Sequence, residues 1–112
     1  MGMDILYGAT PQRRAHKAVK NFDLVRCTES FQCCKNDKWH QVLDIIDEYS
    51  FEQNKRFWGT FAIKDTDIEA MINKIMETEA FKEFNLTTQE GFKGMMFYNG
   101  DNDKALIVNV SY

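Results

Sequence analysis

The stretch Lys93–Tyr112, KGMMFYNGDNDKALIVNVSY, decides the predicted fold. Its middle, Asn99–Asp103, contains the Asn, Gly and Asp residues that tolerate the positive φ angles of a tight reversal. The segment Ala105–Tyr112 alternates apolar and polar side chains over much of its length, which is typical of a strand with one covered face. We therefore predict two strands, 93–98 and 105–112, joined by a hairpin, so that at least one strand pair is antiparallel.

Helical and extended patterns alternate along the rest of the chain. Apolar residues at helical spacing and a capping box of Thr66 with Glu69 predict a helix over residues 66–84. The other expected elements are helices over 11–21 and 37–49 and strands over 4–7, 24–34 and 56–63. The order βαβαβαββ predicts an α+β fold in one domain over residues 1–112. We expect a two-layer sandwich in which three helices cover an approximately five-stranded mixed or antiparallel sheet.

The charges are unevenly distributed along the 112 residues, whose net charge is −3. Residues 1–40 hold seven basic and four acidic residues, whereas residues 41–112 hold seven basic and thirteen acidic ones. A nucleic-acid-binding domain is usually strongly basic as a whole. The composition therefore favours a surface with two regions of opposite charge, which would steer partners.

The cysteines and the first residues indicate a cellular compartment. Cys27, Cys33 and Cys34 are an odd number, which does not predict a disulfide framework. The first residues lack the basic segment and apolar run of a secretory signal. No stretch approaches the ~18 apolar residues that a membrane span needs. We expect a cytoplasmic protein, in its own cell or in an infected host, that does not act in a membrane.

The segment from Thr10 to Lys20 predicts an anion-binding surface on the first helix. Thr10 and Pro11 are expected to begin that helix, and arginine binds phosphate through two parallel hydrogen bonds. The candidate anion-binding residues are Thr10, Arg13, Arg14, Lys17 and Lys20. The segment lacks the glycine-rich phosphate-binding motifs, so a solvated basic helix face explains the same pattern.

The acidic residues of the second helix predict a surface for a protein partner. Such a surface can cover a basic nucleic-acid channel on another protein, and Trp58 is a candidate interfacial aromatic. The candidate partner-binding residues are Asp44, Asp47, Glu48, Glu52 and Trp58. The apolar C-terminal strand is predicted to be a sheet edge, through which two copies would form a homodimer.

Patterns for catalysis and metal binding are weak. Five residues separate Cys27 from Cys33, whereas zinc ligands are typically separated by two to four. Cys33 and Cys34 would point to opposite faces of a strand. A pairing of a cysteine with His16 or His40 has no family signature around it. We predict no catalytic residue, no metal and no cofactor.

Three functional classes follow from these patterns. We predict first a small non-enzymatic binding or regulatory protein that docks on a macromolecular partner, of the inhibitor or immunity type found in bacteria and phages. The second class is a nucleotide or nucleic-acid binding domain that uses the basic first helix. The third class is a small enzyme with a Cys/His site.

Overall fold

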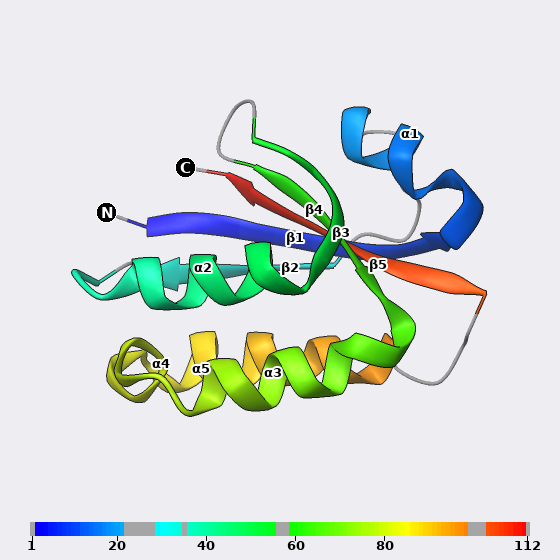
Figure 1. Ribbon diagram of the computed structural model, residues 1–112. Helices are drawn as coiled ribbons and strands as arrows, with labels where there is room; N and C mark the ends of the chain where they lie inside the picture. The colour runs from blue at the N-terminus through cyan, green and yellow to red at the C-terminus, as the bar shows by residue number, and fades with distance from the viewer. Residues whose placement is uncertain (1, 22–28, 35, 56–58, 99–102, 112) are drawn as a thin grey trace.

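The computed structural model describes residues 2–21, 29–34, 36–55, 59–98 and 103–111, and Figure 1 shows how their elements are arranged. The strands are β1 (Gly2–Pro11), β2 (Glu29–Cys34), β3 (Ser50–Asn54), β4 (Thr60–Lys64) and β5 (Lys104–Ser111). The α-helices in these ranges are α1 (Ala15–Lys20), α2 (Trp39–Tyr49), α3 (Ile68–Met76), α4 (Glu79–Glu83) and α5 (Leu86–Gly94). Short 3-10 helices cover Gln12–Arg14, Asp65–Asp67 and Met95–Tyr98.

The sheet has the strand order β2-β1-β5-β4-β3, and every neighbouring pair is antiparallel. The C-terminal strand β5 is central, because it pairs with β1 on one side and with β4 on the other. The prediction that this strand is a free edge is therefore wrong, since its backbone groups are already used on both sides. A homodimer stays a prediction. The two edges of the sheet are β2 and β3.

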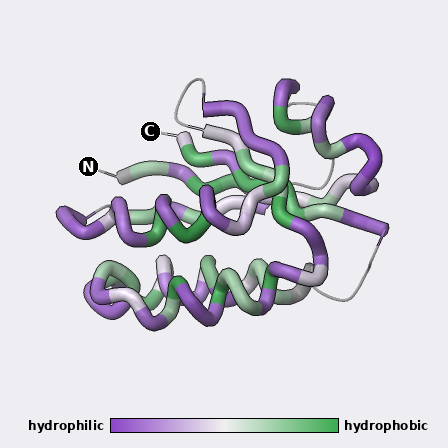
Figure 2. Tube along the Cα trace, in the orientation of Figure 1, coloured by the Kyte–Doolittle hydropathy of each residue, from purple (hydrophilic) through white to green (hydrophobic). Residues whose placement is uncertain are grey.

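One face of the sheet carries the main core. Alternate residues of the central strands, such as Ile5, Phe61 and Val108, are almost fully buried and pack with apolar residues of α2, α3, α4 and α5. Burying each such side chain stabilises the folded state by about 1.5–3 kcal/mol relative to leaving it exposed. Figure 2 shows hydrophobic residues along the middle of the sheet and hydrophilic residues along much of α1. The predicted α+β class is confirmed, with an all-antiparallel sheet.

The opposite face of the sheet is covered in part by α1. Ala15, Ala18 and Val19 of this helix form a second cluster of buried residues, together with Ala62, Ala105 and Ile107 of the sheet. Side chains of successive strand residues point to opposite faces, so this cluster lies across the sheet from the main core. Figure 1 shows α1 on the other side of the sheet from α2 and α3. The two-layer prediction therefore missed a partial third layer.

The predicted helix over 66–84 is two helices, because Thr78 interrupts it. The Thr78 hydroxyl donates to the carbonyl of Ile75 at 2.7 Å and accepts the N–H of Phe81 at 3.1 Å. The same side chain thus ends α3 and caps the start of α4. The predicted capping box at Thr66 is also wrong, since α3 begins at Ile68 after a 3-10 helix and has no side-chain cap.

Residues 93–98 are helical, which corrects the prediction of a C-terminal hairpin. The Asn85 side chain accepts the N–H of Thr88 at 2.9 Å and starts α5. Phe92 and Met95 are fully buried at a spacing of three residues, so the apolar run after Gly91 belongs to a helix. The strand that replaces 93–98 in the sheet is β3, which was not predicted because its sequence, SFEQN, is largely polar.

The helix α5 lies very close to the edge strand β2. The Thr88 hydroxyl donates to the carbonyl of Gln32 at 3.1 Å, which satisfies a backbone group of that strand. A Cβ atom added to Gly91 would clash with Cγ of Phe31, at the base of the ring. The close approach therefore requires a glycine at position 91.

We expect Gly91→Ala to lower the free energy of unfolding by about 1–2 kcal/mol in urea denaturation. Overpacking against Phe31 typically costs about 1–3 kcal/mol, and better helix propensity returns at most about 1 kcal/mol. The matched control is Gly94→Ala, whose Cβ would meet only the Tyr7 hydroxyl at 3.1 Å. Equal stabilities for the two variants would contradict the packing argument.

Candidate functional site

A groove of about 730 Å³ lies between the end of β1, the helix α1 and the start of β5. The antiparallel register sets Pro11 opposite Lys104 and Thr10 opposite Ala105. The N–H of Gln12 donates to the carbonyl of Asp103 at 2.8 Å and holds the two segments together where the chain leaves β1. The residues that line the groove are Ala9, Thr10, Pro11, Arg14, Lys17, Ala18 and Lys104.

The charge of this groove is positive. Arg14, which directly precedes α1, and Lys17 of α1 are three residues apart and line the same groove, while Ala15 and Val19 are buried. Arg14, Lys17 and Lys104 line the groove, and its described lining includes no acidic residue. In the described ranges, neither Arg14 nor Lys17 forms an ion pair with a side chain of the protein. Cations grouped in one concave site attract anions and form charge-assisted hydrogen bonds with them.

The structure brings together three of the five candidate anion-binding residues, namely Thr10, Arg14 and Lys17. Arg13 is exposed and does not line the groove. Lys20 lines a second groove, of about 540 Å³, with residues of β3. The sequence prediction missed Lys104, because only the non-local pairing of β1 with β5 brings this residue beside α1.

The predicted role of Thr10 as a helix cap is wrong. Thr10 and Pro11 are the last residues of β1, and the chain turns into a 3-10 helix at Gln12 without a side-chain cap. The regular helix α1 covers only Ala15–Lys20 rather than residues 11–21. The cationic side chains therefore make this site, with the Thr10 hydroxyl at its edge.

The acidic surface formed by the candidate partner-binding residues is partly neutralised by lysines of the same chain. Asp47 pairs with Lys55 and Glu48 with Lys74, each at 3.1 Å. The Glu52 carboxylate lies within hydrogen-bond distance of His16 Nδ1, also at 3.1 Å. The hydrogen bond to Glu48 raises the pKa of Lys74 above its ordinary value. Asp44 is exposed and forms no ion pair among the described side chains, and Trp58 lies outside the described residues. The prediction of a protein partner on this surface stays a prediction.

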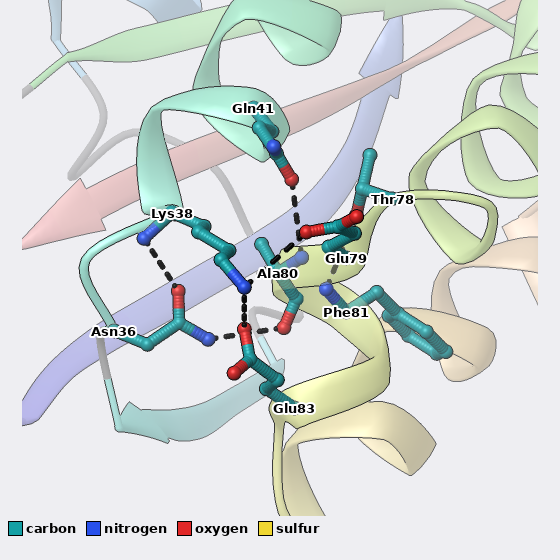
Figure 3. A network of polar contacts seen from close by, with 8 residues as sticks. All are labelled: Asn36, Lys38, Gln41, Thr78, Glu79, Ala80, Phe81 and Glu83. Carbon is teal, nitrogen blue, oxygen red and sulfur yellow. Dashed lines mark hydrogen bonds and ion pairs between the residues drawn. The ribbon is translucent and has the colours of Figure 1, made fainter.

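A second polar cluster joins the start of α2 to α4, as Figure 3 shows. The ammonium of Lys38 lies 2.9 Å from Glu83 and 3.2 Å from Glu79. Asn36 donates to the carbonyl of Ala80 at 3.0 Å and accepts the Lys38 N–H at 3.0 Å. The N–H of Ala80 donates to Gln41 at 3.1 Å. These contacts satisfy backbone groups and fix the position of α4, so we assign the cluster a structural role.

The cysteine and histidine residues do not gather into one site in the described part of the chain. Cys33 is fully buried in the main core, whereas His16 and His40 are exposed. Cys27 and the side chain of Cys34 lie outside what the structure describes. Within the described ranges, no three His, Cys, Asp or Glu side chains are grouped so that they could hold a metal ion.

Comparisons with known proteins add no functional information. No protein-family model, no curated protein and no solved structure matches this chain. None of the helices in the described segments combines the length and the apolar composition needed to cross a membrane. The function is therefore argued from the grooves and their charges.

The Lys38 cluster predicts a pH dependence of stability. The hydrogen bonds and charges of Glu83 and then Glu79 raise the pKa of Lys38 above its ordinary value of 10.5. A group whose pKa is higher in the folded state than in the unfolded state stabilises the fold. This stabilisation is fully present below the unfolded-state pKa and is lost as the pH rises through the folded-state pKa. We therefore expect wild type to melt at a higher temperature than Lys38→Gln at pH 7, with a smaller difference above about pH 10.5.

The control for this measurement is Lys82→Gln, at an exposed position of α4 outside the ion pairs of Lys38. Its melting temperature relative to wild type is expected to stay constant over the same pH range. A pH-independent difference between wild type and Lys38→Gln would show that the ion pairs do not contribute to stability.

Proposed function

We propose that this protein is a small binding protein whose groove between β1, α1 and β5 takes a phosphate-bearing ligand. The observation that carries the proposal is the grouping of Arg14, Lys17 and Lys104 around one groove whose described lining has no acidic residue. A phosphate group offers several strong acceptor oxygens and up to two negative charges, which matches several cations better than one carboxylate does.

We propose binding rather than catalysis at this groove. Its described lining contains no His, Cys, Asp or Glu that could act as a general base toward the Thr10 hydroxyl. The Thr10 hydroxyl and the cations are suited to hold an anion. The ion pairs of Asp47 and Glu48 favour this groove over the acidic surface as the principal site, because they reduce the charge that surface offers to a partner. A cytoplasmic location stays our expectation.

We expect isothermal titration with inorganic triphosphate, in about 50 mM salt, to show binding that Arg14→Glu/Lys17→Glu weakens about 100-fold. Each lost charge-assisted hydrogen bond is worth about 1.5–3 kcal/mol, and 1.4 kcal/mol corresponds to a factor of ten. The measurement compares the dissociation constants of the variant and wild type.

The matched control is Lys82→Glu/Lys93→Glu, which changes the net charge by the same amount at exposed positions of α4 and α5. This control is expected to bind triphosphate within about threefold of wild type, since exposed distant charges are screened by salt. An equal loss in both double variants, or no binding by wild type, would contradict the proposal.

A further inference from the structure

The helix α1 is a ridge between two grooves. One side of the helix contributes Arg14, Lys17 and Ala18 to the first groove. His16, Val19 and Lys20 line the second groove, with Asn21, Glu52, Gln53 and Asn54. At about 100° per residue, these two sets of α1 positions lie on opposite sides of the helix. Ala15 and Ala18 are buried against the sheet, whereas Lys17 and Lys20 on the outer side of the helix are exposed.

The cations of α1 and of the 3-10 helix before it extend beyond the first groove. Arg13, Lys17 and Lys20 are all exposed. Arg13, in the 3-10 helix, and Lys20, at the end of α1, are seven residues apart, which is about 10–14 Å along helical turns. One phosphate group cannot contact both ends of such a row, so the distribution favours a ligand with several phosphates along its length.

We propose that the ligand is double-stranded DNA, with α1 in the major groove and one phosphate backbone in each of the two grooves beside it. This inference rests on the proposed function and names its ligand. An α-helix is about 10–12 Å across and the major groove of B-DNA is about 12 Å wide, so the ridge fits between the two backbones. The duplex carries one negative charge per about 1.7 Å of its length, which matches a row of cations.

The residues beside the ridge favour duplex DNA over other nucleic acids. The described linings of the two grooves contain no Phe, Tyr or Trp side chain, and His16 is their one aromatic ring. Proteins that bind single strands stack the bases on aromatic rings, so backbone contact with a duplex fits this surface better. The major groove of duplex RNA is deep and narrow and does not admit a helix in this way.

Glu52 opposes this binding and therefore offers a specific test. Its carboxylate lines the second groove and lies 3.1 Å from His16 Nδ1. A phosphate backbone in that groove would be repelled by Glu52, whereas triphosphate in the first groove would not meet it. We expect Glu52→Gln to bind a DNA duplex about threefold more tightly, as removal of one exposed like charge does, and to leave triphosphate binding unchanged.

The experiment measures fluorescence anisotropy of a labelled 20-base-pair DNA duplex with the full chain, over a series of salt concentrations. Arg13, Arg14, Lys17, Lys20 and Lys104 would neutralise four or five phosphates. We expect the logarithm of the binding constant to fall with the logarithm of the salt concentration with a slope of about −4. Lys20→Gln is expected to make this slope about one unit less steep without changing triphosphate binding, and Lys93→Gln is expected to change neither.

The outcomes separate this inference from the proposed function. If triphosphate binds but the duplex slope is about −1 and Lys20→Gln has no effect, the ligand occupies the first groove alone and the DNA inference fails. Tighter binding of single-stranded DNA, duplex RNA or polyglutamate than of duplex DNA also overturns it. If wild type binds neither triphosphate nor duplex at low salt, both proposals fail.

Discussion

The pairing of β5 on both sides is the constraint on which the rest of the structure depends. Its Leu106, Val108 and Val110 face the layer of α2–α5, while Ala105 and Ile107 face α1. A strand with apolar side chains on both faces is suited to a central position. The register of β5 with β1 also sets Lys104 opposite Pro11, at the point where the chain turns into α1. The same ladder therefore organises the core and brings a distant lysine to the candidate site.

Local patterns predicted the parts of the fold that local interactions determine. The apolar stripe of residues 37–49 predicted α2, and the alternation in residues 105–112 predicted β5. The hairpin prediction failed because a contiguous apolar run such as Met95–Tyr98 suits a buried strand and a buried helical turn equally. The preceding Asn85 cap was the local signal for the helix. The polar strand β3 follows α2 directly and is defined by its pairing with β4. A short stretch of sequence around β3 does not reveal this pairing.

Only the part of the candidate site that lies in one continuous segment could be predicted from the sequence. Thr10, Arg14 and Lys17 are close in the sequence, so their grouping was visible before the structure. Lys104 comes from the other end of the chain and reaches the groove through strand pairing. The net charge of the acidic surface could not be predicted from the sequence for a related reason. Counting acids along α2 does not show that Lys74, on α3, lies 3.1 Å from Glu48.

Helix stability alone does not explain the sequence of α1 and of the two arginines before it. Its first turn carries no acidic residue, and Arg13 and Arg14 precede it, where the positive end of the helix dipole disfavours cations. Lys17 and Lys20 lie in the last turn, where the helix dipole favours cations. As like charges three residues apart they also repel each other, which costs about 0.2–0.5 kcal/mol in a helix. The buried side of the helix offers only Ala and Val side chains to offset this. Residues that weaken local structure without a compensating gain in stability are typical of functional sites. A bound polyanion would remove the repulsion among these cations, so the same charges that weaken α1 in the free protein favour the complex.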